Sequence, residues 1–449
     1  MQLGTEGNGG NIDITASKIS MNDGATIESS TFGTGNAGNI QVQNSDLITG
    51  DLILENDALI AADTFSADAI GGNIKIEVGK LIANNGGQIS TGSGEQFQEG
   101  NFGRGGDLVV TAFDSIELDG VGNANRTGFF AETSSPNRAG DLTVNTNKLI
   151  VQNGAGISSG ASGSGSLGGD GGNLVINATE SIDLIGTSSN YRSALVTQAN
   201  GLGNAGDMKI TTSRLNVTDE AVISTLVTSG ERTTNQFTVG NGGNIDITVD
   251  SMEVANGSRI IAATFGLGFA GNINIQANEY ISLDGTSENF SSGVSSSVGE
   301  SGIGVGGDIR INTREFSLSN GAEVVASVDD GGWGEAGNIQ INADKGVTLN
   351  NRAKLFAESA SGNGGNIKLE LGELLLLRNS SQVSTTAGTA QAGGDGGNID
   401  INSPFIVALP NEDSDITANA FEGRGGNVDI ITQGIFGIQP RSQTTLQSD

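Results

Sequence analysis

The stretch Gly242-Gly243-Asn244-Ile245-Asp246-Ile247 decides the fold, because the chain repeats its pattern almost from end to end. A Gly or Ala, a Gly, an Asn or Asp and an apolar residue recur fourteen times, at intervals of 28 to 37 residues. A repeat of this length indicates an array in which each unit is one supersecondary piece stacked on its neighbours. The Asn or Asp of the successive copies is Asn11, Asn39, Asn73, Asp107, Asp141, Asn173, Asp207, Asn244, Asn272, Asp308, Asn338, Asn366, Asn398 and Asn427.

Each unit contains short segments with the period of a half-buried strand. In the first unit, residues 12–14 and 18–21 alternate apolar and polar, Asn22-Asp23-Gly24 predicts a turn, and residues 25–28 predict a third strand. The first and third residues after the repeated Asn or Asp are apolar in every copy, so one face of that strand points inward. No stretch combines a helical apolar period with helix caps.

Three strands per unit, repeated in one register, predict a coil in which equivalent strands stack in parallel. Parallel crossovers are almost always right-handed, so we expect an all-β, right-handed parallel β-helix of about 14 coils. The expected organisation is a lead-in over residues 1–10, a repeat array over 11–426, and a last, incomplete coil over 427–449. The units that start at 107, 173 and 272 carry a longer second corner, which a solenoid tolerates because loop closure costs grow slowly with length.

Composition excludes several classes of function. The net charge is −30, from 51 acidic and 21 basic residues without a basic cluster, so nucleic acid and anionic lipid surfaces are poor partners. The chain has no Cys and no His, which removes disulfides, thiolate metal sites and the commonest general base. No apolar run approaches the 18 residues of a membrane-spanning helix.

The repeated Asn or Asp has two interpretations. The favoured one is a stacked ladder, because both side chains offer an oxygen to backbone N–H groups at a corner that Gly opens. The alternative is a column of oxygens that binds Ca²⁺, with Asp107 and Asp141 as weak candidates because they would lie on neighbouring coils. Residues 168–173 and 393–398 resemble a Ca²⁺-binding nonapeptide, but that motif acts in tandem. We therefore expect no cofactor and no catalytic site.

Aromatic residues gather in the loop before the motif. We expect them to cover apolar surface at a corner, and the alternative is an adhesive row. These residues are Phe32, Phe65, Phe102, Phe265, Trp333 and Phe421.

An enzymatic function is a further hypothesis, because β-helices include polysaccharide lyases and hydrolases. Galacturonan hydrolases combine an Asp pair with a Gly-His-Gly, whereas this chain has one Asp-Asp pair, Asp329-Asp330, and no His. We expect that pair to lie in a solvated corner.

The repeats resemble those of filamentous-haemagglutinin-like exoproteins of two-partner secretion, especially the cyanobacterial branch. The resemblance is carried by Gly38-Asn39-Ile40, Ser30-Thr31-Phe32-Gly33 and residues 318–322, and most specifically by residues 404–410, 414–420 and 434–438. It covers essentially the whole chain. It implies a right-handed β-helix, an outer-membrane pore partner for the full-length protein, and surface display or release as an adhesin.

Such exoproteins begin with a signal peptide and a secretion domain, neither of which precedes the first repeat here, so we expect a segment of a longer protein. The expected role is non-catalytic: an acidic scaffold that presents itself to a glycan or cell-surface ligand outside the cell. The alternatives are a Ca²⁺-stiffened surface-layer component and a polysaccharide-active enzyme. For the isolated chain we expect fraying of the end coils and end-to-end self-association, because uncapped coils expose unpaired strand edges.

Overall fold

A computed structural model of the chain describes residues 7–33, 35–46, 50–65, 69–93, 103–122, 125–162, 168–228, 239–300 and 302–438. Among the residues in these ranges there is no helix, and hence none long and apolar enough to cross a membrane. The chain divides into two compact units: the first comprises residues 1–249 with 266–268, and the second comprises residues 250–265 with 269–449.

Both units have the predicted fold, a parallel β-solenoid, and together they hold about 12 turns whose paired strands lie about 33 residues apart in the sequence. Every one of the fourteen motif copies directly precedes a strand. The Asn or Asp therefore ends a corner, and the alternating apolar residues after it begin the wall of the next turn. The motif thus sets the register in which successive turns pair.

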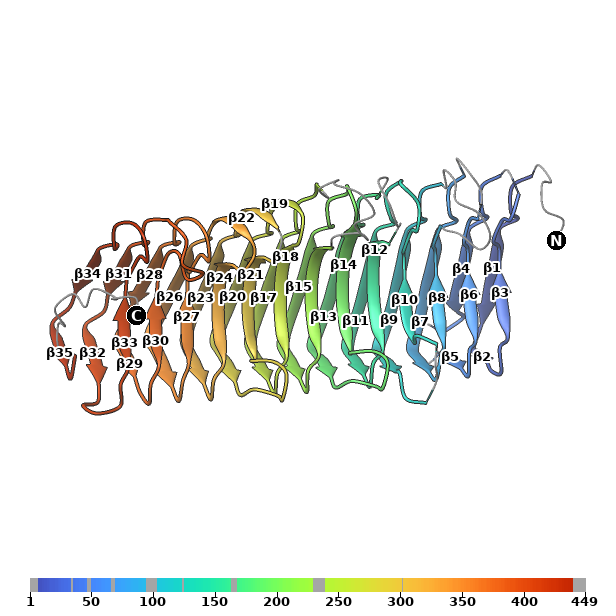
Figure 1. The fold of residues 1–449 in the computed structure, drawn as a ribbon. Helices are drawn as coiled ribbons and strands as arrows, with labels where there is room; N and C mark the ends of the chain where they lie inside the picture. Colours follow the sequence, from blue (N-terminus) through green and yellow to red (C-terminus); the bar gives the residue numbers. More distant parts are fainter. Residues whose placement is uncertain are drawn as a thin grey trace. The chain divides into compact units, whose positions relative to one another are not determined.

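The first unit contains two walls of parallel strands. Figure 1 shows β9, β11, β13 and β15 stacked side by side in this unit. The first wall contains β1 (Ile12–Ala16), β2 (Lys18–Met21), β4 (Ile40–Asn44), β5 (Asp51–Glu55), β7 (Ile74–Asn84), β9 (Leu108–Asp119), β11 (Leu142–Gln152), β13 (Leu174–Ile185) and β15 (Met208–Thr218). The second wall contains β3 (Thr26–Glu28), β6 (Leu59–Ala61), β8 (Gln88–Ser90), β10 (Gly128–Phe130), β12 (Gly156–Ala161), β14 (Ala194–Asn200) and β16 (Val222–Thr228).

The second unit repeats this plan. Its first wall contains β20 (Ile273–Asp284), β23 (Ile309–Ser319), β26 (Ile339–Asn350), β28 (Ile367–Leu371), β29 (Leu374–Leu377), β31 (Ile399–Asn402), β32 (Phe405–Ala408), β34 (Val428–Ile431) and β35 (Gly434–Phe436). Its second wall contains β18 (Arg259–Thr264), β21 (Gly293–Val298), β24 (Glu323–Val328), β27 (Lys354–Phe356), β30 (Gln382–Ser384) and β33 (Asp415–Thr417). A short third pairing joins β22 (Ile303–Val305) to β25 (Trp333–Glu335). The boundary between the units falls within β17 (Ile245–Ala255), and β19 (Leu267–Phe269) also contains residues of both.

The middle turns differ from the prediction of three separate strands, because their first two strands are continuous. Residues 116–118, which alternate apolar and polar as residues 18–21 do in the first unit, are the end of β9, and the pairing of β9 with β11 shifts register between Thr146 and Lys148. A register shift of this kind bends a strand without ending its ladder, as a β-bulge does. In these turns the first and second strands of the unit therefore meet at a bend in one continuous strand, where the sequence pattern predicts a gap between two separate strands.

The core is the column of apolar side chains inside each unit. Along β11, residues Leu142 and Val144 are fully buried and the residues beside them are half-exposed. Phe129 and Phe316 are the largest fully buried side chains, one in each unit. In β34 the equivalent Val428 is 40% exposed, because the described residues include no further strand against it. A turn therefore completes its core only when its neighbours are present.

The corner from the first wall to the second is three to eight residues long. In most turns it is three residues long, as at 153–155, where Asn153 and Gly154 have φ of 54° and 86°. Consecutive left-handed residues favour Asn-Gly, which tolerates this region. After β9, β13 and β20 the corner is eight residues long, over 120–127, 186–193 and 285–292. These three inserted corners are the ones that the sequence predicted.

Candidate functional site

The repeated Asn and Asp side chains form a ladder of hydrogen bonds within each unit. The side-chain Oδ1 of one copy accepts the backbone N–H of the equivalent residue one turn later, with N···O distances of 2.8–3.0 Å. In the first unit the ladder runs from Asn11 to Asn244, and in the second from Asn272 to Asn427. The ladder residues are exposed or half-exposed, so water competes for each bond and one rung contributes about 0.5–1.5 kcal/mol.

The Gly before the ladder residue lies in close contact with the preceding turn, as at Gly106, whereas a Cβ on Gly10 in the first turn would meet nothing within 4 Å. A Cβ on Gly106 would lie 2.2 Å from the carbonyl oxygen of Gly72, the equivalent residue one turn earlier. Thr91 of the second wall closes the corner from inside, donating its hydroxyl to the Gly106 carbonyl at 2.7 Å. The position before this Gly is less restricted, and Ala occupies it in five copies (Ala37, Ala139, Ala205, Ala270 and Ala336).

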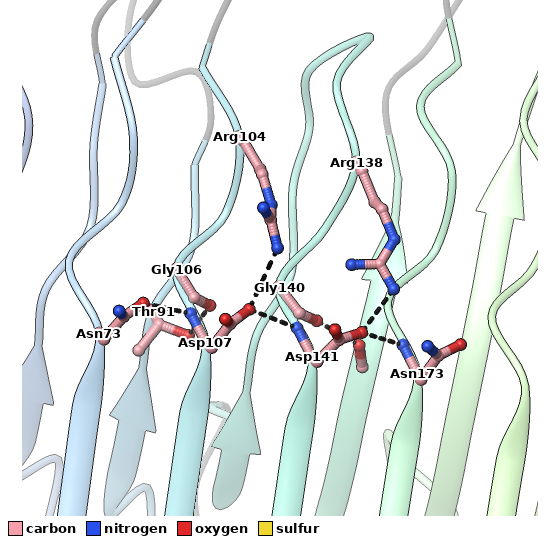
Figure 2. Close-up of polar contacts among 10 residues, drawn as sticks. Asn73, Thr91, Arg104, Gly106, Asp107, Arg138, Gly140, Asp141 and Asn173 are labelled. Atoms are coloured by element: carbon pink, nitrogen blue, oxygen red, sulfur yellow. Dashed lines mark hydrogen bonds and ion pairs between the residues drawn. The ribbon is translucent and has the colours of Figure 1, made fainter.

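Asp107 and Asp141, the weak Ca²⁺ candidates, are each paired with an arginine. Figure 2 shows Arg104 reaching Asp107 and Arg138 reaching Asp141, at Nη2···Oδ1 distances of 3.4 and 2.5 Å. Burial disfavours the charged form of Asp141, but the Arg138 guanidinium and the N–H of Asn173 outweigh it and lower the pKa of Asp141. Two guanidinium groups therefore supply positive charge where adjacent carboxylates would otherwise repel each other.

A second ladder lies three residues before the first, and the sequence analysis missed it. Where that position holds Asn or Asp, the side chain accepts the backbone N–H of the next turn, as Asp170 does from Asn204 at 2.8 Å. Asp395 accepts in the same way from Arg424 at 2.8 Å. Both Asp residues belong to the segments that resemble a Ca²⁺-binding nonapeptide. The sequence indicates this second ladder by an Asn or Asp three residues before the ladder residue in seven of the fourteen copies (Asn8, Asn36, Asp170, Asn204, Asn241, Asn363 and Asp395).

The loop aromatics do not share one environment. Phe32 and Phe65 stack with ring centroids 4.8 Å apart and an interplanar angle of 12°. Phe265 is half-buried, whereas Trp333 and Phe421 are 68% and 40% exposed. Phe102 lies outside the described residues. Part of this set therefore covers a corner, and part is open to solvent.

The acidic residues do not assemble into a metal site within the described part of the chain, where no three acidic side chains come together in a ligand arrangement. Asp329 and Asp330, the candidate pair of a hydrolase, are both exposed at a corner after β24. Asp329 accepts a hydrogen bond from the hydroxyl of Ser327 at 2.7 Å.

A polar groove of about 300 Å³ lies in the first unit, on residues of β8 and β10 and of two inserted corners. This volume is at the lower end of the range for ligand sites, ~300–1,000 Å³. Its lining consists of Gln88, Ser90, Asn125, Arg126, Phe130, Glu132 and Tyr191. We call this set the corner groove.

Arg126 organises the corner groove. Its guanidinium lies over the Phe130 ring at 4.1 Å, and its Nη1 donates to both carboxylate oxygens of Glu132 at 2.9 and 3.0 Å. The Gln88 side-chain amide donates to the Arg126 carbonyl at 2.7 Å, which fixes the backbone of the corner. Because the arginine is held on two sides, it forms a rigid wall of the groove.

Below the corner groove, a carboxyl group is tied to the second wall. Asp63 accepts the hydroxyl of Ser90 at 2.8 Å and the N–H of Gly92 at 2.6 Å. Burial raises the pKa of Asp63 despite these two bonds. No motif in the sequence marks the groove residues individually. The signal for them was the longer corners of the units that start at 107 and 173, which bring Arg126 and Tyr191.

A scan against protein-family models found no match, and searches of curated proteins and of solved structures found no similar chain. The assignment of function therefore depends on the geometry described above.

Proposed function

We propose that the chain is a non-catalytic structural segment of a surface-displayed or secreted adhesin, of the filamentous-haemagglutinin-like type that its repeats resemble. In this role the solenoid is the support, and the corners between its walls meet the partner. The full-length protein would leave the cell through an outer-membrane pore partner, as that resemblance implies.

The observation that carries the proposal is the contrast between the two kinds of corner. The corner that carries the motif keeps the same hydrogen-bond ladder through each unit. The opposite corner accepts eight-residue insertions without interrupting the strands on either side, as between β13 and β14. A scaffold needs this combination: an invariant part that holds the turns together and a variable part that is exposed to partners.

The charge of the protein disfavours nucleic acid and anionic lipid as partners. The net charge of −30 repels polyanions. The Arg104–Asp107 and Arg138–Asp141 pairs reduce the need for a bound cation on those two turns, which favours the adhesin over the Ca²⁺-stiffened alternative.

Adhesion of coated beads tests the proposal. Beads carrying the purified chain should adhere to cell or glycan-coated surfaces more than beads carrying a non-adhesive protein of similar charge. The adhesion should persist in EDTA, because the rungs of both ladders are hydrogen bonds from backbone N–H groups to side-chain oxygens. Adhesion no greater than that of the control beads would refute the proposed role. Adhesion that is lost in EDTA and restored by Ca²⁺ would favour the surface-layer alternative.

A further inference from the structure

The corner groove has the chemistry of a site for sugar hydroxyl groups, an inference that rests on the proposed scaffold role. Hydroxyl groups both donate and accept hydrogen bonds, so a matching site mixes amides, a carboxylate and a guanidinium. The amides of Gln88 and Asn125 line the groove beside the Arg126–Glu132 pair. The Gln88 amide donates to the Arg126 carbonyl at 2.7 Å and the Asn125 amide to Asp57 Oδ1 at 2.8 Å, and each of these bonds uses one of the four hydrogen-bonding positions of an amide. Its residues come from β8, β10 and two corners, which the solenoid holds at a fixed spacing.

An aromatic side chain completes the lining. Tyr191 lies on the inserted corner 186–193 and is 37% exposed, so its ring is accessible to a ligand. The carbonyl of Tyr191 accepts the N–H of Ser188 at 2.7 Å, which closes the tip of that corner and positions the side chain. An exposed ring with a hydroxyl combines an apolar surface with a polar tip, which matches the apolar and hydroxyl-bearing faces of a sugar ring.

The charge of the corner groove selects against anionic ligands. Arg126 and Glu132 neutralise each other across 2.9 Å, and among the described residues they are the only charged side chains that line the groove. The surrounding protein carries a net charge of −30, so a uronate or a phosphate gains no attraction to offset its desolvation. An uncharged ligand does not incur this cost.

We propose that the corner groove binds an uncharged, polyhydroxylated ligand, the exposed end of a neutral glycan. Tyr191 contacts a sugar face, the Gln88 and Asn125 amides bond its hydroxyl groups, and Arg126 with Glu132 forms the polar wall. Phe130 is 5% exposed beneath Arg126 and supports that wall rather than contacting the ligand.

Titration calorimetry of the full chain with neutral and uronate oligosaccharides of equal length tests the groove. We expect binding of a neutral oligosaccharide that Tyr191→Ala weakens about tenfold, the loss expected for an aromatic anchor. Tyr280→Ala is the matched control, because Tyr280 is the only other tyrosine and is 36% exposed in the second unit. Glu132→Gln leaves Arg126 unneutralised, so it should shift the preference toward the uronate oligosaccharide.

Three results would overturn the groove: no neutral oligosaccharide binds, Tyr191→Ala and Tyr280→Ala weaken binding equally, or uronates bind the unmodified chain better. The bead assay separates this inference from the proposed function. Beads with Tyr191→Ala that adhere as well as unmodified beads leave the adhesin role intact and refute the groove. Unmodified beads that do not adhere refute the adhesin role, while calorimetric binding would still support the groove.

Discussion

Replacing Gly106 with Ala tests whether the close approach of successive turns requires Gly in the motif. The new Cβ would lie 2.2 Å from the Gly72 carbonyl oxygen, whereas real Cβ atoms essentially never approach below 3.0 Å. The two turns must therefore separate locally by at least 0.8 Å. The obstacle is backbone, so no side-chain rotation relieves it.

The cost follows from the hydrogen bonds that cross this corner. Asp107 N–H donates to Asn73 Oδ1 at 2.9 Å, Ile74 N–H to the Asp107 carbonyl at 3.0 Å, and Gly71 N–H to the Arg104 carbonyl at 2.9 Å. A separation of that size takes all three beyond the ~3.2 Å limit of a good hydrogen bond. At ~0.5–1.5 kcal/mol for each of the three lost bonds, we expect a destabilisation of about 1.5–4.5 kcal/mol.

Native-state hydrogen exchange is the appropriate assay, because long repeat arrays open in parts and do not give a single free energy of unfolding. Gly106→Ala should accelerate exchange at Ile74 and Leu108 more than at Ile210, four turns from Ile74. Gly10→Ala is the matched control, because Gly10 holds the same motif position and a Cβ there would meet nothing within 4 Å, so it should cost much less. If the two substitutions accelerated exchange equally, the close contact with the preceding turn would not be the reason that the motif requires Gly.

Three further predictions concern the ladder and its charges. Asn366→Ala removes the acceptor for the N–H of Asn398 and should destabilise the fold by about 0.5–1.5 kcal/mol. Asn366→Asp keeps the accepting oxygen and should destabilise the fold less. Thermal unfolding that ranks the two variants in the opposite order would contradict the ladder. Arg138→Gln removes the cation beside Asp141, so millimolar Ca²⁺ should raise the Tm of this variant more than that of the unmodified chain. An equal rise in Tm for the two proteins would show that Arg138 does not substitute for a metal ion. Burial raises the pKa of Glu358 above the ordinary value of a glutamate carboxyl, so the folded state binds this proton more tightly, and stability falls as pH rises from below the ordinary pKa through the raised one. Glu358→Gln should flatten this part of the pH–stability curve, and an unchanged curve would refute the assignment.

The fold was predictable because the signal is repeated. One copy of Gly-Gly-Asn before an alternating segment is a weak indication, but fourteen copies in register leave few arrangements other than stacked parallel turns. The continuous β9 and β11 were not predictable in the same way. Their bend is made by a register shift against neighbouring turns, and pairing between turns is not written in any single segment.

The candidate site was predictable only in part. The ladder position followed from the motif, but which oxygen accepts which N–H depends on the stacking of the turns. The arginines at 104 and 138 occupy the second-ladder position, so they change the electrostatics around Asp107 and Asp141 in a way that reading the motif alone overlooked. The corner groove combines Gln88 with Tyr191, about a hundred residues apart, which only the three-dimensional turns bring together.

The most direct test of the account measures binding and bond cleavage in one sample. The purified full chain is incubated with a panel of neutral and uronate polysaccharides, and both retained polysaccharide and newly formed reducing ends are quantified over time. A non-catalytic adhesin predicts that at least one neutral polysaccharide is retained while reducing ends stay at the level of the protein-free control. Reducing ends that accumulate in proportion to the amount of protein, or a complete lack of retention, would contradict it.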